Sequence, residues 1–335
     1  MAARKGLDMV DNGSDCRLQS LAALGGGHGL FQTLRAARYL DLPDITAVVT
    51  VADDGGSSGR IRRELGQIPP GDLRMAIAAL SADSPDGRLW EEVLQHRFGG
   101  HGALAGHAVG NLLIAGLTDV LGSRVAALDR VAELARCRGR VVPVVDQPLD
   151  IEADVSGLDD DPRIMRPVRG QVSVASTPGR VRRVRLIPDS PRACPDAVDA
   201  IMRADMVTLG PGSWFTSVIP HVLVDDVVQA IARSQALKVV VLNLMSEPGE
   251  TAGFSAERHI HMLAQHAPAL RVDRIVVDSN AIPSTSERTH LARAAAGVGA
   301  SVCMHDVAEM DASGALTGRH DPVKLARALA AECAR

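Results

Sequence analysis

Short, continuous apolar runs alternate along the chain with segments of helical periodicity. The runs of strand length cover residues 45–51, 206–209, 238–244 and 274–277. Leu30, Leu34 and Ala37 lie at i, i+4 and i+7, which places them on one face of a helix. Continuous apolar strands that alternate with helices are typical of a sheet that is covered on both faces. The pattern therefore predicts an α/β fold with a doubly wound, mostly parallel sheet.

Three further segments are predicted to be helices. Residues 109–121 are almost entirely apolar and predict a buried helix. Asp72 is expected to cap a helix that follows it, because an aspartate side chain can accept hydrogen bonds from free N–H groups. Asp321 is expected to cap the last helix, with Pro322 at the first helical position.

One stretch interrupts this rhythm. Residues 168–175 and 180–187 alternate in part between apolar and polar positions, and Thr177-Pro178-Gly179 lies between them. The pattern predicts a β-hairpin or a small antiparallel layer inserted at about residues 165–190. The second arm carries Arg180, Arg182, Arg183 and Arg185. We interpret these arginines as a solvated strand face, with an anion-binding patch as the alternative.

Length and composition limit the class of protein. The chain has 335 residues, of which 46% are hydrophobic and 23% charged, so we exclude disorder of the whole chain. Its net charge of −4 and its 2% of aromatic residues argue against a nucleic-acid-binding protein. No apolar run reaches the ~20 residues of a membrane span. We expect a loose polar tail over residues 1–19 and a single domain over residues 20–335.

The five cysteines are scattered and form no C-x-x-C pair, which argues against a thiolate zinc site and indicates a reducing, cytosolic environment. His96, His101 and His107 do not have the spacing of a short metal-ligand pair on one helical turn. We therefore do not expect a metal held by histidine.

The first candidate site is a glycine-rich loop between a predicted strand and a predicted helix, comprising Gly25, Gly26, Gly27, His28 and Gly29. Glycines let a backbone approach a phosphate closely, and N–H groups at the start of a helix favour an anion. The dinucleotide pattern G-x-G-x-x-G is absent, and so is the P-loop pattern. The segment is either a phosphate-binding loop of another kind or only a tight turn.

A second polar loop follows the predicted strand at 45–51 and comprises Asp53, Asp54, Gly55, Gly56, Ser57, Ser58 and Arg60. Because ligands of doubly wound sheets lie beyond the carboxyl ends of the strands, Asp53 or Asp54 could accept hydrogen bonds from ribose hydroxyls or hold Mg²⁺. Arg60 could bind a phosphate. A capped polar loop without a ligand is the alternative.

Three later segments add polar groups to the same predicted rim. His107 and Asn111 are four residues apart and share a helix face. After the strand at 206–209 come Gly210, Pro211, Gly212, Ser213, Thr216 and Ser217. The segment that begins at Asn243 carries Glu247, Glu250 and Thr251, for which an ordinary polar loop is the alternative. The nucleophile pattern G-x-S-x-G is absent.

These motifs occur in an order that resembles the YvcK-type gluconeogenesis factor family of the CofD-like superfamily. The resemblance runs from about residue 20 to the C-terminus. It is carried by G-G-G-x-G, V-T-V-A-D-D-G-G-S-S-G-R, P-P-G-D-L-R, G-H-x-x-G-N, G-P-G-S-x-x-T-S, P-G-E-T and R-H-D. The long second string is highly specific.

The resemblance implies a CofD-like, Rossmann-like α/β fold, a cytoplasmic location and a role in carbon metabolism, cell-wall synthesis and cell shape. It also implies binding of a nucleotide sugar such as UDP-N-acetylglucosamine. CofD itself transfers a phospholactyl group to a deazaflavin, using Mg²⁺ and an acidic pair comparable to Asp53 and Asp54. A non-catalytic nucleotide-sugar sensor is therefore our first hypothesis, and a Mg²⁺-dependent CofD-like transferase is the alternative. An NAD dehydrogenase is a distant third because the dinucleotide pattern is missing.

The resemblance also implies individual ligand-binding residues. Asp72 and Arg74 belong to the P-P-G-D-L-R string, and Arg319 matches a basic position near the C-terminus. This chain departs from the family at His28, where a threonine is usual, and at His290, where a tyrosine is common. Thr317 lies in a small polar turn and is a candidate target of a Ser/Thr kinase, with an unmodified turn residue as the alternative. The oligomeric state stays open, and a homo-oligomer is one of the options.

Overall fold

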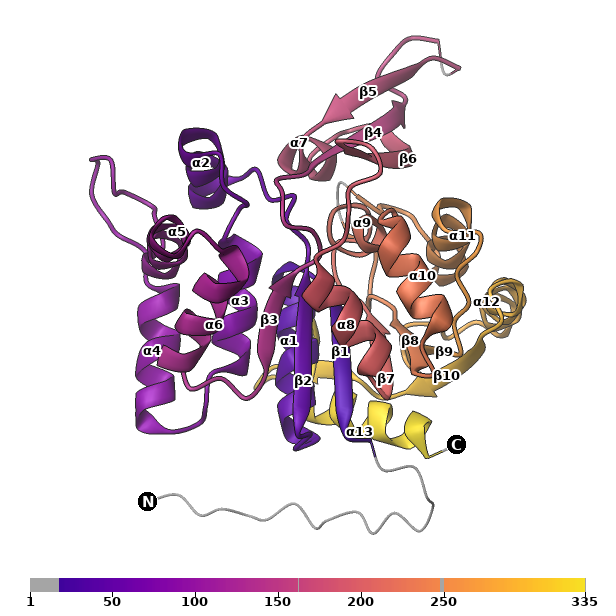
Figure 1. Ribbon diagram of the computed structural model, residues 1–335. Coiled ribbons are helices and arrows are strands. Elements are labelled where there is room, and N and C mark those ends of the chain that lie inside the picture. The colour runs from indigo at the N-terminus through magenta and orange to yellow at the C-terminus, as the bar shows by residue number, and fades with distance from the viewer. Residues whose placement is uncertain (1–17, 162, 248–249, 335) are drawn as a thin grey trace.

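The computed structural model describes residues 18–161, 163–247 and 250–334 (Figure 1). The tail expected over residues 1–19 lies, as far as residue 17, outside the described residues. The described part consists of a central sheet with helices on both faces and a smaller sheet that projects beyond the carboxyl ends of the central strands (Figure 1).

All pairings between the seven described strands of the central sheet are parallel, which confirms the predicted fold class. The order is β10-β9-β8-β7-β1-β2-β3. The strands are β1 (Ser20–Gly25), β2 (Asp44–Val49), β3 (Arg140–Pro143), β7 (Met206–Leu209), β8 (Leu237–Val241), β9 (Arg274–Asp278) and β10 (Ser301–His305). From the neighbouring strands β1 and β7 the chain proceeds outward in opposite directions, so a crevice is expected where these two strands end.

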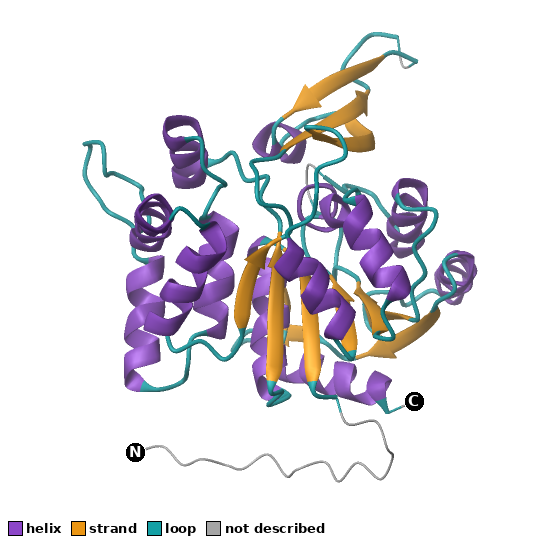
Figure 2. Ribbon diagram, viewed as in Figure 1, coloured by secondary structure: helices purple, strands orange, loops and turns teal. Residues whose placement is uncertain are grey.

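Helices connect the strands and cover the sheet. In Figure 2, α8 and α10 lie in front of the sheet and α1 lies behind it. The helices are α1 (Gly27–Tyr39), α2 (Gly56–Leu65), α3 (Gly71–Leu80), α4 (Pro85–Gln95), α5 (Val109–Leu121), α6 (Arg124–Leu134), α7 (Gln171–Ala175), α8 (Pro195–Arg203), the π-helix η1 (Trp214–Val218), α9 (Ile219–Val222), α10 (Asp225–Arg233), α11 (Ala256–His266), α12 (Thr285–Gly297) and α13 (Pro322–Cys333).

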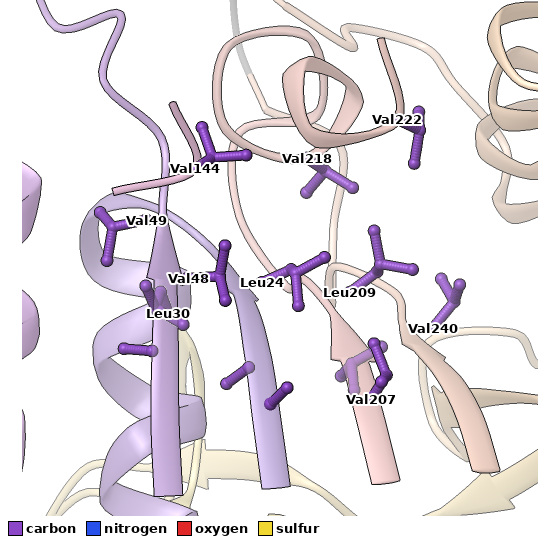
Figure 3. Packing of buried hydrophobic residues seen from close by; sticks show 14 of the residues in the cluster. Leu24, Leu30, Val48, Val49, Val144, Val207, Leu209, Val218, Val222 and Val240 are labelled. Atoms are coloured by element: carbon purple, nitrogen blue, oxygen red, sulfur yellow. The ribbon is translucent and has the colours of Figure 1, made fainter. Parts of the chain in front are cut away.

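The core is built mainly from aliphatic side chains of the central strands (Figure 3). Leu24 of β1 pairs in register with Val48 of β2 on one side and with Leu209 of β7 on the other, and all three are fully buried. Two large aromatic side chains, Trp214 and Phe215 of η1, are fully buried as well. The core therefore extends to the carboxyl ends of the strands and holds the loops that follow them.

The insertion departs from the predicted hairpin. It contains three antiparallel strands in the order β5-β4-β6, namely β4 (Asp150–Ser156), β5 (Met165–Arg169) and β6 (Arg180–Ile187). The small antiparallel layer is confirmed, but the direct pairing of two hairpin arms is wrong, because residues 171–175 form α7 and both outer strands pair with β4. The sequence pattern of β4, which the prediction missed, is nevertheless typical of a strand. Ile151, Ala153 and Val155 alternate with polar residues and are buried. A second small sheet pairs β11 (Ala308–Met310) with β12 (Leu316–His320).

The predicted helix ends have different outcomes. Asp321 caps α13 as expected, since its Oδ1 accepts hydrogen bonds from the N–H groups of Val323 and Lys324. The expected cap at Asp72 is wrong, because α3 begins at Gly71 and the Asp72 side chain is buried in its first turn. The apolar segment 109–121 is α5, but its burial is partial: Val120 is 81% exposed.

In the described part of the chain, no single helix has the length and apolarity needed to cross a membrane. The bent pair Trp214–Val222 and Asp225–Arg233 passes that test on length and composition when taken together. Its apolar side chains are packed into the protein core.

We predict that Asp321→Ala lowers the free energy of unfolding by about 1 kcal/mol, because two N–H groups at the start of α13 lose their acceptor. The change is measured as a shift of the urea midpoint at constant slope. Asp321→Asn is the matched control and should lose much less, since asparagine caps helices about as well as aspartate. Equal losses for both variants would contradict a capping role.

Candidate functional site

The glycine-rich loop and the loop after β7 meet where β1 and β7 end. A Cβ atom placed on Gly29 would lie 2.1 Å from the carbonyl oxygen of Pro211. One placed on Gly26 would lie 2.7 Å from Oδ2 of Asp72 and 3.3 Å from Oγ of Ser217. Both positions therefore require glycine, because the opposing groups leave no room for a side chain.

Gly27 has a different environment. Its φ is +56°, and no described atom lies within 4 Å of the position that a Cβ would take. Gly27 begins α1, its N-cap residue Gly26 has no side chain to cap the helix, and the backbone of Gly27 lies near enough to the carboxyl group of Asp72 to lower the pKa of that group. The first N–H groups of a helix without a side-chain cap are available to an external acceptor, and the helix dipole favours an anion there.

Asp72 lies beneath this loop and is 9% exposed. Its Oδ2 has no hydrogen-bond partner among the described residues, and Gly26 is the backbone that it approaches. Burial, and then the negative charge of Asp53, raises the pKa of Asp72 to about 7. The acidic pair of this site is therefore Asp53 with Asp72, and not Asp53 with Asp54.

A buried polar network joins three of the predicted motifs. The Nε group of Arg74 donates to Oδ1 of Asn111 at 2.9 Å, and Nδ2 of Asn111 donates to Oγ of Ser57 at 3.0 Å. The same hydroxyl lies 2.9 Å from Nδ1 of His107. Burial is the main cause that lowers the pKa of His107, and it also lowers the pKa of Arg74 to about 10. Nη1 of Arg74 has no partner among the described residues, so this network leaves one buried donor free.

On the other side of the crevice, side chains from the loop after β8 hold the loop after β7. Asn243 accepts a hydrogen bond from the N–H of Gly212 and donates one to its carbonyl, both at 2.9 Å. Glu250 accepts from the N–H of Phe215 at 2.9 Å and from Oγ1 of Thr216 at 2.5 Å. Burial raises the pKa of Glu250 to about 7.

The sequence predicted Glu250 as a polar group of the rim, with an ordinary polar loop as the alternative. Its two hydrogen bonds hold the start of η1 in place, so Glu250 supports the loop from Gly210 to Ser217. Ser217 is itself buried, and its Oγ faces Gly26 across the crevice.

Two cavities lie along this crevice. The smaller, of about 130 Å³, is lined by the predicted residues His28, Gly29, Pro211, Gly212, Asn243 and Arg319, among others. The larger, of about 290 Å³, shares Asn243, Leu244 and Met245 with the smaller one and continues to Phe254, Glu257, His259 and Glu287. His290 is exposed, and its Nδ1 lies 3.6 Å from Oε2 of Glu257, so it stands near the rim of the larger cavity.

Three predicted residues are engaged elsewhere. Oδ1 of Asp54 accepts a hydrogen bond from the N–H of Val172, at 2.9 Å, and so ties the second loop to the insertion. Arg60 donates to the carbonyl groups of Ala105 and Ala103 at 2.6 and 3.3 Å. Thr317 is exposed on β12, where its hydroxyl donates to Oε2 of Glu309 at 2.7 Å.

The described residues contain no group of three or more His, Cys, Asp or Glu side chains arranged to hold a metal ion. Asp53 lies beside the start of α3, since its Oδ2 would be 2.6 Å from a Cβ placed on Gly71, the residue before Asp72, and its charge raises the pKa of Asp72. Asp53 and Asp72 could supply two oxygen ligands to Mg²⁺, provided that a bound phosphate supplied others. Asp54, which faces the insertion, does not join them.

Comparison with known proteins agrees with this geometry. The family model of 2-phospho-L-lactate transferase CofD matches residues 21–319. A gluconeogenesis factor of Mycobacterium tuberculosis is 59% identical over 94% of this chain and 90% of its own length. The gluconeogenesis factor of Bacillus subtilis is 38% identical over 81% and 82%. A crystal structure of a UPF0052 family member from Bacillus halodurans superposes with a TM-score of 0.81 and 32% identity, covering 94% of this chain and all of that one.

The chain belongs to the CofD family and, within it, to the YvcK-type gluconeogenesis factors.

We predict that two glycines of the glycine-rich loop tolerate replacement by alanine to different degrees. Gly29→Ala should lower the free energy of unfolding by about 3 kcal/mol or more, because its Cβ overlaps the carbonyl oxygen of Pro211. Gly27→Ala should cost only about 1–2 kcal/mol, the strain of a left-handed backbone, because its Cβ points into open space. The two variants are compared by denaturant unfolding, and equal losses would show that the loops do not pack as described.

We predict that Asp72→Asn stabilises the protein. The folded-state pKa of Asp72 lies above its ordinary value of 3.8, at about 7. Its carboxyl group therefore contributes fully to stability below the ordinary pKa, and that contribution is lost as pH rises to about 7. The gain in unfolding free energy of Asp72→Asn over the wild type should be larger at pH 8 than at pH 5. The exposed Asp199→Asn is the control, and a gain independent of pH would contradict the prediction.

Proposed function

We propose that this protein is a cytosolic binding protein for a nucleotide sugar such as UDP-N-acetylglucosamine, and that it regulates carbon metabolism, cell-wall synthesis and cell shape. The observation that carries the proposal is the open space at Gly27. There the start of α1, whose N-cap residue has no side chain, faces the crevice between β1 and β7, next to two cavities that share wall residues.

The diphosphate is placed at the start of α1. Backbone N–H groups and the helix dipole favour an anion at this position. Arg319 and His28 line the smaller cavity beside it, and a guanidinium group can bind a phosphate with two parallel hydrogen bonds. The departure from threonine at position 28 exchanges a hydroxyl for an imidazole, which can also donate a hydrogen bond to a phosphate oxygen.

The nucleoside is placed in the larger cavity. Its walls combine apolar side chains such as Phe254 and Ile282 with the carboxylates of Glu257 and Glu287. Apolar side chains can contact a base, and carboxylates accept hydrogen bonds from ribose hydroxyls. The volume of about 290 Å³ is close to the lower end of small-molecule sites, which suits one half of an extended ligand that spans both cavities.

The transferase alternative has its own supporting observation. Asp72 carries a raised pKa, a free buried oxygen and a neighbouring carboxylate, and strongly perturbed acids gather at catalytic sites. Against it, Arg60 and Asp54 are engaged in contacts that hold loops of the protein together. We therefore favour binding without turnover.

We predict that UDP-N-acetylglucosamine raises the thermal midpoint by several degrees and that NAD raises it less. At ~100 times the dissociation constant the expected stabilisation is about 2.7 kcal/mol. The measurement is a thermal shift titration with both ligands. Equal shifts with NAD, or no shift with the UDP-sugar, would overturn the proposed ligand.

Matched variants locate the effect. Arg319→Ala should weaken binding by about 1.5–3 kcal/mol, the range of a hydrogen bond to a charged group. Arg233→Ala is the control and should leave binding unchanged, because Arg233 is the last residue of α10 and does not line either cavity. The titration is repeated with Mg²⁺ and with a chelator, and the products are analysed. An affinity that is lost in chelator together with conversion of the ligand would favour the transferase alternative.

A further inference from the structure

The strands of the small sheet contain six arginines, and three of them are paired with carboxylates. Arg166 pairs with Asp159, Arg169 pairs with Asp150, and Arg185 pairs with Glu152 and Asp154. Because an ion pair cancels the field of each partner at a distance, these arginines add little net charge to the surface of the insertion. The carboxylates of the small sheet are therefore engaged by these three arginines.

Three arginines of β6 and one of α11 differ from these. Among the residues that the structure describes, Arg180, Arg182, Arg183 and Arg258 form no ion pair with a carboxylate. The first three are exposed on an outer strand of the small sheet, and Arg258 is partly buried on α11. We call these four residues the arginine cluster.

The fold holds the cluster in place. Nε of Arg182 donates to Oγ of Ser156 at 2.8 Å, and the guanidinium group of Arg258 lies over the ring of Phe254, 4.1 Å from its centroid. The edge of β6 is fixed to α11 because the N–H of Val184 donates to Nε2 of His266 at 3.0 Å. That hydrogen bond brings β6 against α11, and after burial the charges of Arg182 and Arg180 lower the pKa of Arg258.

Like charges held together repel one another, and among the described residues none of the four arginines has a carboxylate as an ion-pair partner. An anionic partner would offset it, and guanidinium groups bind carboxylates with paired, directed hydrogen bonds. Arg180 and Arg182 lie on either side of Val181 in β6, and the register of β6 against β4 shifts at Arg182, so that Arg180, Arg182 and Arg183 are all exposed. The exposed outer strand also suits an elongated partner rather than a single small anion.

We propose that the arginine cluster, between β6 and α11, is a docking surface for an acidic, extended segment of a partner protein. A nucleic acid is disfavoured because the chain is acidic overall and poor in exposed aromatic side chains for stacking. A lipid surface is disfavoured because the exposed side chains of β6 are charged and not apolar.

The position of the cluster connects it to the proposed ligand site. Phe254 supports Arg258 on one side and lines the larger cavity on the other. A partner docked on the cluster would therefore lie next to the cavity that we assign to the nucleoside. The docking surface itself does not depend on that assignment, since its charges are present without any ligand.

The test uses the full chain and a fluorescently labelled peptide of alternating glutamate and threonine, measured by fluorescence anisotropy. We expect the wild type to bind it at about 50 mM salt and to release it at about 500 mM, where exposed charges are screened. Arg180→Glu combined with Arg182→Glu should weaken binding by at least about tenfold. Arg203→Glu combined with Arg233→Glu is the matched control, because these exposed arginines lie at the opposite end of the central sheet, and it should bind as the wild type does.

Several outcomes would overturn the proposal. They are no binding of the peptide by the wild type, equal loss in both double variants, and tighter binding of single-stranded RNA or of vesicles with anionic lipid than of the peptide. Thermal midpoints verify that both double variants are folded, and Arg180→Lys with Arg182→Lys, which keeps the charge, should retain most of the affinity. The stabilisation by UDP-N-acetylglucosamine should persist in the Arg180→Glu, Arg182→Glu variant. Its loss there would assign the cluster to the ligand site and would also overturn the docking proposal.

Discussion

The close approach of two backbones at the ends of β1 and β7 is the constraint on which the rest of the site depends. Gly29 and the carbonyl group of Pro211 are so near one another that no side chain fits between them. Because β1 and β7 are neighbours in the sheet while their loops lead to opposite sides, this contact joins the two halves of the protein. Asn243 and Glu250 accept hydrogen bonds from the loop after β7 and so hold that loop in place beside the glycine-rich loop.

Burial of polar groups is the second constraint, and it has an energetic cost. Asp72 and Glu250 are buried carboxyl groups whose pKa values are raised to about 7, and Arg74 and Asp72 each keep an atom without a described partner. A buried polar group without a partner destabilises a fold, and such groups are retained where they serve binding or catalysis. Among them, Asp72 lies directly beneath the glycine-rich loop. The instability of the site is thus concentrated at the place where an external ligand can relieve it.

The small antiparallel sheet is attached to the rest of the protein by buried side chains that belong to the common core, by the ion pair of Arg62 with Asp150 and by two hydrogen bonds near the site. Asp54 accepts a hydrogen bond from Val172, and Val184 donates one to His266 of α11. Both hydrogen bonds connect the small sheet to elements that border the crevice, so they hold the sheet beside the cavities. The arginine cluster depends on this attachment, because Arg258 belongs to the α/β body while Arg180 and Arg182 belong to the insertion.

The sequence by itself determined the features that depend on local chemistry. The alternation of apolar runs with helical patterns predicted the parallel sheet, and Asp321 with Pro322 predicted the start of α13, because periodicity and capping involve residues a few positions apart. The motifs also identified residues that line one crevice, such as His28, Asn243 and Arg319. The order of the strands explains why residues so far apart in the chain meet.

Tertiary structure alone decided which polar groups become partners. Asp53 and Asp54 are adjacent in sequence, yet Asp53 acts on Asp72 whereas Asp54 binds the insertion. The expected hairpin failed for the same reason, since the partner of β5 and β6 is β4, which precedes both in the chain. Pairing in a sheet and the pKa of a buried group depend on contacts across long stretches of sequence, and local patterns contain no record of which distant segment supplies the contact.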